Sequence, residues 1–388
     1  MGRVKVLILT GSYGGGHEQA AIALEKAFNL IPAHYTAEVL DVTSLVPAKL
    51  DSLEKRTFLS GVTHFPSLYH YFYKKTQKNN AAATLLKTLT SVGITRLIPV
   101  IEDAQPDIII STFPPASIMM SRIKQADWFT NLPFLTVITD YSVHSTWVNR
   151  KTDGYLVASD TIRHRLIEMN VDPRKIITTG IPILPDFSAS PQREVLRARF
   201  GIPSNQKILL VMGGGCGIFS HFMSFLRQLE KLETGDLKIV IICGHNAKAY
   251  REFSHYRTVS GQNIQVLRFV HNMNEWMAMA DLLITKPGGL TISEAIASRL
   301  PMIIYKPLGG QEADNTKFLL SLGISIASFS STELITDLMN LLESPSALEI
   351  MRTNMDGLSD KQQISALHAV KASIRFLPAG TLNAMEFA

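Results

Sequence analysis

The sequence predicts an α/β protein with two domains, each built around a parallel sheet. Short apolar runs of strand length alternate with longer segments of helical periodicity, which is typical of parallel α/β folds. Each half of the chain opens with an apolar run that leads into a glycine cluster and then a helix. The length of 388 residues also suits about two to three domains. We therefore expect two Rossmann-like domains that face a cleft.

The first half supplies one sheet and its first crossover helix. A helix is expected over Glu18–Phe28 because Ala20, Leu24, Ala27 and Phe28 share one face. The expected strands are Val4–Thr10, Ala37–Val42, Asp107–Ser111, Phe134–Thr139 and Gly154–Ala158.

The second half repeats the pattern. Helices are expected to begin near Phe219, Asn274, Leu290 and Asn315, and a C-terminal helix over Lys361–Phe376 has apolar residues at helical spacing. The expected strands are Lys207–Met212, Leu237–Cys243, Ile264–Phe269, Leu282–Thr285 and Pro301–Tyr305.

The proline-rich stretch between the halves predicts a hinge over residues 181–203. This gives an N-terminal domain over 1–180, a C-terminal domain over 204–360, and a final helix and tail over 361–388.

The composition is that of a globular protein with a modest charge. Hydrophobic residues make up 46% of the chain, which excludes disordered and collagen-like classes, and two cysteines exclude a disulfide scaffold. Charged residues are only 18%, which suits either a surface that touches a membrane or a large core. The net charge of +5 is too mild for a general nucleic-acid binder.

The compartment is expected to be reducing, because Cys216 and Cys243 have no metal-ligand or disulfide spacing. The first apolar run reads as a strand, not as a signal peptide, and no apolar run reaches the roughly 18 residues of a membrane span. We expect a cytoplasmic or peripheral membrane protein.

The first glycine-rich turn runs from Thr10 to His17. Glycines between a strand and a helix expose backbone N–H groups to a ligand. The turn is not a P-loop, because His17 and Glu18 replace the Lys and Ser/Thr that hold phosphate and magnesium. Tight packing of strand on helix is the structural alternative. Asp41, after the second strand, could imitate the ribose ligand of an NAD enzyme.

Two later turns point to a nucleotide sugar. Met212–Gly217 occupies the same position in the second domain, and Thr285–Ala295 places two glycines and Lys286 at a helix start, with Glu294 about one turn inside. Such a helix start with a lysine can hold a diphosphate, and a carboxylate inside it can accept hydrogen bonds from a sugar diol. The alternative for Glu294 is a solvated carboxylate. The loop Pro307–Asn315 adds polar side chains where open α/β sheets bind ligands.

These motifs resemble a known family. KPGG-x-T-x-x-E and PxxGQExxN resemble the donor site of GT-B glycosyltransferases, and GSYGGGH with Thr139–Trp147 resembles the monogalactosyl- and processive diglucosyl-diacylglycerol synthases. The resemblance covers residues 3–375. It implies a GT-B fold whose C-terminal helix returns to the N-terminal domain, a UDP-sugar donor in the C-terminal domain, and a diacylglycerol acceptor at the N-terminal domain.

The resemblance also implies roles for individual residues. Phe269 and Val270, with Met273 nearby, would line the uracil pocket, and Glu294 would hold the ribose. Lys286, Gly288 and Gly289 would hold the diphosphate, and Gly213 and Gly214 would lie along the nucleotide. The sugar would be held by Gln311, Glu312 and Asn315.

The expected reaction is inverting and needs no metal. No DxD motif occurs in the chain, so helix starts and Lys286 must stabilise the leaving UDP. His17 is the candidate base, because it ends the first glycine turn and histidine titrates near neutral pH. Asp140 is expected to orient His17 or to share its role. The alternatives are that His17 caps a turn or contacts a phosphate, and that Asp140 is an N-cap.

A basic, aromatic segment predicts a membrane surface. No acidic residue occurs between Glu54 and Glu102, and lysines there alternate with aromatic residues, a pattern that favours an anionic bilayer. Packed helices with a solvated lysine face, or a nucleic-acid surface, would have the same composition. The residues assigned to the acceptor and the membrane are Gly14, Gly15, Gly16, His144, Trp147, Phe65, Tyr69, Phe72, Lys74, Lys75 and Lys78; for Trp147 a place in the core is the alternative.

The function expected is transfer of glucose or galactose from a UDP-sugar to diacylglycerol, on the inner face of the cell membrane. The alternatives are a related transferase with a polyprenyl-linked or sterol acceptor, a UDP-GlcNAc epimerase of the same fold, and a nucleotide-sugar-binding protein without turnover. An NAD-dependent dehydrogenase does not account for the KPGG and GQE motifs.

Overall fold

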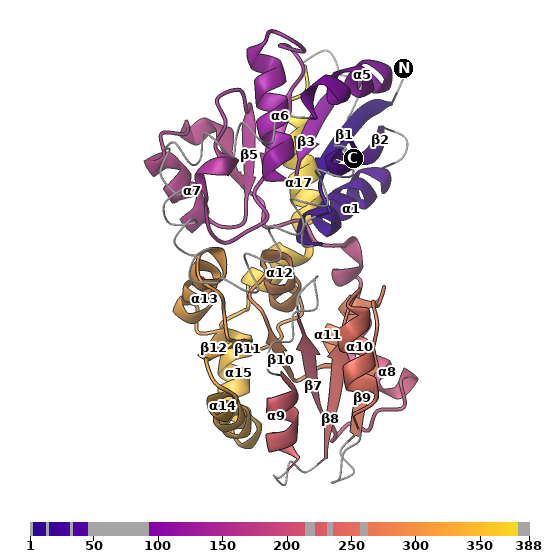
Figure 1. Ribbon diagram of the computed structural model, residues 1–388, viewed down its shortest axis with the longest axis vertical. Coiled ribbons are helices and arrows are strands. Elements are labelled where there is room, and N and C mark those ends of the chain that lie inside the picture. Colours follow the sequence, from indigo (N-terminus) through magenta and orange to yellow (C-terminus); the bar gives the residue numbers. More distant parts are fainter. Residues whose placement is uncertain are drawn as a thin grey trace. The chain divides into compact units, whose positions relative to one another are not determined.

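The computed structural model describes residues 3–12, 15–31, 34–45, 93–213, 222–230, 236–256 and 263–378. Contacts divide the chain into two compact units (Figure 1). Unit 1 comprises Met1–Pro185, Leu308–Gln311 and Ile364–Ala388, and unit 2 comprises Asp186–Pro307 and Glu312–Gln363. Within the described ranges, no helix is long and apolar enough to cross a bilayer.

Unit 1 is built on a parallel sheet. In spatial order its described strands are β2 (Tyr35–Asp41), β1 (Val4–Thr10), β3 (Ile108–Ser111), β4 (Phe134–Val137), β5 (Gly154–Val157) and β6 (Ile176–Thr178). Its described helices are α1 (Gly16–Asn29), α5 (Ile94–Ala104), α6 (Pro114–Gln125), α7 (Asp160–Glu168) and α17 (Ser365–Ile374), with short 3-10 turns η1 (Val42–Leu45), η2 (Ser145–Trp147) and η3 (Pro173–Lys175).

The two faces of this sheet bury different helices, because side chains alternate along each strand. Val6 and Ile8 of β1 pack in a cluster with α1 and α17, whereas Leu7 and Leu9 pack in a cluster with α5 and α6. The last helix, α17, therefore completes the core of unit 1 and lies against α1 (Figure 1). This is the return of the C-terminal helix that the resemblance implied.

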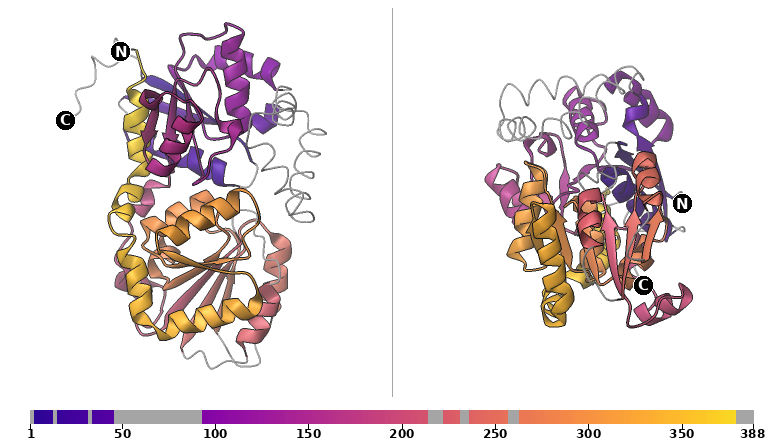
Figure 2. Two further views of the ribbon diagram at one scale, coloured as in Figure 1. Left: turned by 90° about the vertical axis from the view of Figure 1, so that its left-hand side faces the viewer. Right: turned by 60° about the horizontal axis from the view of Figure 1, so that its bottom comes forward.

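Unit 2 repeats the architecture. In spatial order its described strands are β12 (Ser325–Ser328), β11 (Met302–Tyr305), β10 (Leu282–Thr285), β7 (Lys207–Met212), β8 (Leu237–Ile242) and β9 (Asn263–Leu267), again all parallel. Its described helices lie on both faces of these strands (Figure 2). They are α8 (Arg193–Arg199), α9 (Phe222–Leu229), α10 (Ala247–Ser254), α11 (Met273–Met279), α12 (Gly289–Ala297), α13 (Gln311–Ser321), α14 (Ser331–Glu343), α15 (Pro345–Thr353) and α16 (Leu358–Gln363); the turn η4 (Pro185–Phe187) lies at the boundary of the units.

The strand order brings distant turns together. In unit 2 the first strand, β7, pairs with β10, and in unit 1 β1 pairs with β3, so each sheet reverses its order beside its first strand. Ligands of open α/β sheets bind at the carboxyl ends of the strands at such a reversal. The α/β class with two parallel sheets is thus confirmed, and the strands that lead into glycine turns, β1 in unit 1 and β7 and β10 in unit 2, lie at the reversals.

Two strands and one helix break were not predicted. The short outer strands β6 and β12 have too few apolar residues to stand out in the sequence. The expected helix over Lys361–Phe376 is two helices, α16 and α17, that belong to different units and separate near Ile364. Residues 186–203, which the sequence assigned to the hinge, pack within unit 2, where α8 contacts α11.

A partly buried ionic cluster holds α8 against the rest of unit 2. The carboxylate of Asp281, just before β10, pairs with Arg193 and Arg197 of α8, the latter at 2.8 Å. It also accepts the backbone N–H of Ile208 at 2.8 Å. The side chain of Arg197 is only 6% exposed, so the free-energy cost of burying its positive charge is offset by this carboxylate.

We expect Asp281→Asn to lower the free energy of unfolding by about 2 kcal/mol, because charge-assisted hydrogen bonds to two guanidinium groups weaken. Denaturant titration measures the change. The matched control is Asp360→Asn, since Asp360 is exposed on α16 and should change stability by less than about 0.5 kcal/mol. Equal stability of the two variants would contradict the role of the cluster.

Candidate functional site

In unit 1 the first glycine turn sets the position of His17. The turn follows β1 and ends at the start of α1, where Gly15 adopts a left-handed conformation (φ 78°) as the N-cap. His17 lies in the first turn of α1. The hydroxyl of Thr112, which follows the neighbouring strand β3, lies 2.9 Å from the His17 carbonyl oxygen.

Packing explains why position 11 is a glycine. A Cβ at this position would lie 2.4 Å from ring atoms of Phe113, so only glycine lets the Phe113 ring pack on the turn. The structural alternative, tight packing, therefore holds at Gly11.

The imidazole of His17 is held between polar and aromatic neighbours. Its Nδ1 lies 2.8 Å from the Thr139 hydroxyl oxygen, and its ring contacts those of Phe113 and Trp147 at centroid distances of 5.3 and 5.9 Å. Although the residue keeps some exposed surface, desolvation lowers the pKa of His17 to about 4, partly offset by a hydrogen bond to the Thr112 backbone, which raises it. His17 is therefore neutral at physiological pH, as a proton acceptor must be.

The loop after β4 carries the other candidates of unit 1. The partner of the His17 Nδ1 is Thr139, one residue before Asp140, so the orienting contact expected from Asp140 comes from its neighbour. Asp140 is buried, and a share in the base role stays a prediction. The His144 side chain caps η2 by accepting the Thr146 N–H at 3.3 Å. Trp147 is 3% exposed and packs in the core, as the alternative had it, and contact with an acceptor stays a prediction.

The residue on which the NAD alternative depends, Asp41, is used in local structure. The Asp41 carboxylate accepts the Thr43 N–H at 2.8 Å and the Thr43 hydroxyl at 2.7 Å, so it caps η1.

In unit 2 the strands β7 and β10, which precede two of the glycine turns in the sequence, pair at the reversal of the sheet. Gly213 follows β7 and is buried, and Gly288 is the N-cap of α12, with Gly289 in its first position. A Cβ on Gly288 would meet nothing within 4 Å, and no side chain caps the helix. The N–H of Gly288 donates to the Lys286 carbonyl at 2.9 Å, so the N–H groups that an anion could reach belong to the first turn of α12 itself, from Gly289 onward.

Lys286 is fixed beside this helix start. Its ammonium donates to the carbonyl of Lys306, a residue that adopts a left-handed conformation (φ 45°) directly before Pro307. Desolvation lowers the pKa of Lys286, the charge of Glu312 raises it, and the nearby Lys306 lowers it. Two cations and the Glu312 carboxylate thus share this corner, which gives it a net positive charge.

Glu294 is buried, not solvated as the alternative had it. It is 9% exposed on α12, and no hydrogen bond or ion pair reaches its carboxylate from the part of the chain that the structure describes. Burial raises the pKa of Glu294 to about 8. A buried carboxylate costs free energy unless something donates to it, so donors from a ligand would be strongly favoured here.

The polar loop supplies a brace that the sequence did not predict. Asn315 on α13 is 1% exposed and donates from Nδ2 to the Pro287 carbonyl at 2.8 Å, which ties α13 to the KPGG turn. Gln311 and Glu312 begin α13 and are half-buried. Their contacts with a sugar stay predictions.

At the expected uracil pocket, Phe269 is joined by two histidine rings that the sequence did not predict. The exposed ring of Phe269 stacks on His245 at 4.5 Å between centroids and contacts the edge of His271 at 5.1 Å. Val270 and Met273 are half-buried next to it in sequence. The two histidines were missed because an isolated histidine after a strand carries no distinctive motif.

Several predicted residues lie outside the described residues: Gly14, Gly214, Phe65, Tyr69, Phe72, Lys74, Lys75 and Lys78. Among the residues that are described, no cluster of His, Cys, Asp or Glu could hold a metal ion.

Comparison with known proteins identifies the family. The model for monogalactosyldiacylglycerol (MGDG) synthase matches residues 17–183, and the model for the glycosyltransferase family 28 C-terminal domain matches residues 208–363. A protein named processive diacylglycerol beta-glucosyltransferase, from Bacillus pumilus, is 32% identical over 364 residues, which cover 91% of each chain. The chain belongs to this family. The first family model lies within unit 1 and includes His17, and the second lies within unit 2 except for residues 308–311 and includes the KPGG turn.

Solved structures share the fold of this diacylglycerol glucosyltransferase family member. Acinetobacter baumannii MurG is 15% identical, with a TM-score of 0.60 over 96% of this chain and 100% of its own. The UDP-GlcNAc 2-epimerase of Neisseria meningitidis, solved with UDP-GlcNAc, is 17% identical, with a TM-score of 0.60 over 95% and 100%. At these identities the likeness concerns the fold alone.

Proposed function

We propose that this protein transfers a hexose from a UDP-sugar to the free hydroxyl of diacylglycerol and inverts the anomeric centre. The observation that carries the proposal is α12, which has no side-chain cap at its start, follows Lys286 closely and holds the buried Glu294, in a member of the diacylglycerol glucosyltransferase family. Glucose is the hexose that the name of the relative specifies, and galactose the one that the family model's description specifies.

The donor end of the reaction is assigned to unit 2. The diphosphate would lie beside Gly288 and accept hydrogen bonds from the N–H groups at the start of α12, beginning with Gly289, because the Gly288 N–H already donates to the Lys286 carbonyl. Lys286 adds a positive charge, whose attraction grows as negative charge develops on the leaving β-phosphate. The ribose hydroxyls would donate to Glu294, and the uracil would lie against the Phe269 group. Lys286 is held by the Lys306 carbonyl before the ligand arrives, and such preorganised groups are what transition-state stabilisation requires.

The acceptor end is assigned to unit 1. The hydroxyl oxygen of diacylglycerol attacks the anomeric carbon as the bond from that carbon to the UDP oxygen breaks, and the hydroxyl proton passes to the imidazole of His17. One direct displacement turns an α-linked donor into a β-glycoside. The lowered pKa of His17 keeps its imidazole neutral at physiological pH, so a ring nitrogen is free to accept that proton, while the same shift makes the ring a weaker base than an ordinary histidine.

A radiolabelled-sugar assay tests the function. Liposomes with and without diacylglycerol are incubated with UDP-glucose or UDP-galactose, in buffer with EDTA, and lipids are identified by mass spectrometry. We expect a β-hexosyl diacylglycerol only where diacylglycerol is present, and full activity in EDTA. Epimerised nucleotide sugar, or binding of UDP-sugar without a glycolipid, would replace the proposal by the corresponding alternative.

The membrane surface is proposed from composition alone. Lys74, Lys75 and Lys78 lie in the basic, aromatic segment, and each basic residue near an anionic bilayer contributes about 1 kcal/mol. We expect the triple lysine-to-glutamine variant to bind phosphatidylglycerol vesicles at least tenfold more weakly in sedimentation. A triple variant of Lys238, Lys248 and Lys371, with the same loss of charge, is the control, and equal binding of the two would contradict this surface. An inner-membrane location rests on the same segment.

The open space above Gly288 gives a sharper test of the donor site. We expect Gly288→Ala to fold with a free energy of unfolding within about 0.5 kcal/mol of the original, because no protein atom meets the added methyl group. Binding of UDP should weaken about tenfold, since the methyl group occupies space beside the diphosphate. Calorimetric titration with UDP measures it.

Gly154→Ala is the contrasting variant. Its Cβ would lie 2.4 Å from Phe376 and 2.8 Å from Leu135, so it should lose stability and keep its affinity for UDP. Unchanged affinity in Gly288→Ala would place the diphosphate elsewhere.

A further inference from the structure

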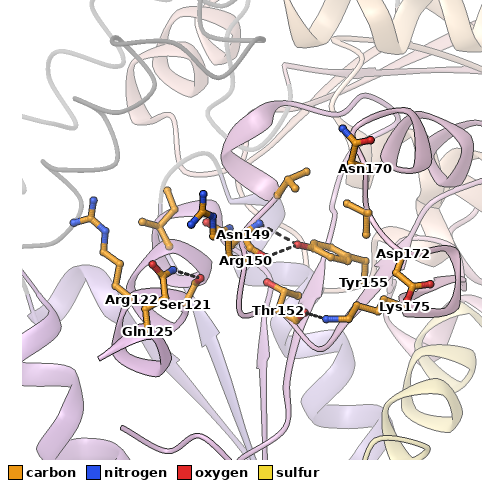
Figure 3. Close-up of a pocket in the computed structure, with 13 residues that line it drawn as sticks. Ser121, Arg122, Gln125, Asn149, Arg150, Thr152, Tyr155, Asn170, Asp172 and Lys175 are labelled. Carbon is orange, nitrogen blue, oxygen red and sulfur yellow. Dashed lines mark hydrogen bonds between the residues drawn. The ribbon is translucent and has the colours of Figure 1, made fainter. Parts of the chain in front are cut away.

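A polar hollow lies in unit 1 that the proposed reaction does not use. Its volume is about 510 Å³, which suits a small organic ligand. Its walls come from the last turns of α6, from the segment before β5 and from the segment that includes η3, before β6 (Figure 3).

The hollow and His17 lie at opposite edges of one sheet. The segments before β5 and β6 enter a parallel sheet at its amino edge, whereas His17, Thr112 and Thr139 stand beyond the carboxyl ends of β1, β3 and β4. A strand rises about 3.3 Å per residue, so a four-residue strand such as β5 separates the edges by about 13 Å. The hollow is therefore a site distinct from the acceptor-activating group.

The charge of the walls is positive. Arg122 of α6 and Arg150 of the loop before β5 lie on one side of the hollow, and Asp172 and Lys175 lie on the other (Figure 3). The Asp172 carboxylate is already held by Arg174 at 2.7 Å and is influenced by Lys175. Among the described residues neither Arg122 nor Arg150 has an ion pair or a side-chain hydrogen bond. Two guanidinium groups are thus open to an anion.

The neutral groups of the walls offer both donors and acceptors. The Ser121 hydroxyl oxygen, 2% exposed, accepts from Gln125 Nε2 at 3.1 Å and from the Lys151 N–H at 3.3 Å, so its hydrogen is available. The Thr152 hydroxyl, 1% exposed, has no partner of good geometry within the described residues. Its neighbour is the Tyr155 hydroxyl.

The Tyr155 hydroxyl beside Thr152 already has two partners of its own. The Tyr155 hydroxyl already donates to the Asn149 carbonyl and accepts the Asn149 N–H, each at 3.0 Å (Figure 3). The amides of Gln125 and Asn170 complete the walls. A buried hydroxyl without a partner is costly, so a ligand that bonds to it would be favoured.

We propose that this hollow binds a phosphorylated polyol, with the phosphate between Arg122 and Arg150 and the hydroxyl groups against the amide and hydroxyl side chains. Guanidinium groups bind phosphate through paired, charge-assisted hydrogen bonds, and a polyol exchanges hydrogen bonds with groups that both donate and accept. Glycerol phosphate has this chemistry both as a free metabolite and as the headgroup of a phospholipid.

The test uses the full chain and sn-glycerol 3-phosphate in calorimetric titration, with UDP present to fill the donor site. We expect saturable binding of one equivalent. The double variant Arg122→Gln/Arg150→Gln should bind at least tenfold more weakly. The matched control, Arg163→Gln/Arg165→Gln on α7, removes the same charge from the same unit and should stay within about twofold of the original.

A second arm separates the two sources of the ligand. Sedimentation with phosphatidylcholine vesicles, with and without phosphatidic acid, shows whether the same arginine pair recognises a lipid-borne phosphate. Binding of the free ester, or of phosphatidic acid alone, that depends on the pair supports the site and names its source. No binding in either arm, or equal binding by the arginine and control variants, overturns it.

Discussion

Replacing His17 by alanine is expected to lower kcat by about 10²–10⁴-fold while the affinity for UDP stays within about twofold. In the proposed reaction the imidazole is the proton acceptor, and among the described residues it contacts Thr112, Phe113, Thr139 and Trp147 of unit 1. Steady-state kinetics with diacylglycerol liposomes, together with calorimetric titration of UDP, separate the two effects. His164→Ala, an exposed histidine on α7, is the control and should keep full activity.

The pH dependence of kcat should distinguish His17, as the proposed base, from a histidine with an ordinary pKa. Because the pKa of His17 is lowered to about 4, its neutral form persists well below pH 6.5, and kcat should stay level from pH 8 down to about pH 5.5. The same shift affects folding, since protonation favours the unfolded chain. The stabilising contribution of His17 is full above pH 6.5 and is lost as the pH falls towards 4. A kcat that halves near pH 6.5, or an active His17→Ala variant, would contradict the role of this base.

Replacing Glu294 by glutamine is expected to lower kcat/KM for the UDP-sugar about 100-fold and at the same time to stabilise the protein. The loss follows because a neutral amide replaces the carboxylate that would accept the ribose hydroxyls. The gain follows because a buried carboxylate without a partner costs free energy. Kinetics and thermal unfolding measure the two effects, with Glu343→Gln, exposed on α14, as the control.

The gain in stability depends on pH in a definite direction. The pKa of Glu294 is about 8 in the folded chain and 4.5 as its ordinary value, so the folded chain holds this proton more tightly. Its stabilising contribution is full below pH 4.5 and is lost as the pH rises through 8. The midpoint of unfolding of Glu294→Gln should therefore exceed that of the original by at least about 2–4 °C at pH 8, and by less at pH 5. A midpoint that falls equally at both pH values would show that the carboxylate has a partner.

The parts of the fold predicted from the sequence are those that bury the most apolar surface. The strands Val4–Thr10, Lys207–Met212 and Leu282–Thr285 have the bounds that the apolar runs indicated, because central strands of a parallel sheet are buried on both faces. The outer strands β6 and β12 have one neighbour each and little apolar surface, so their sequences resemble loops.

The candidate site was predictable where a motif carries its chemistry. Lys286, Gly288 and Glu294 follow from spacing along one turn and one helix. The carbonyl of Lys306 that holds Lys286, and the Thr139 hydroxyl beside His17, come from segments distant in the sequence. Only the pairing of the strands brings them there, and any residue type supplies a backbone carbonyl. Contacts of this kind cannot be predicted from a single sequence.

The position of α17 has a consequence for synthesis of the chain. The sheet of unit 1 ends at Thr178, but one of its faces is covered in part by a helix that begins at Ser365. A nascent chain at 5–20 residues per second needs roughly 10–40 s to make the intervening stretch. During that interval the apolar face of α1 that packs against α17 has no partner helix. The core of unit 1 can therefore be completed only after nearly all of unit 2 has been synthesised.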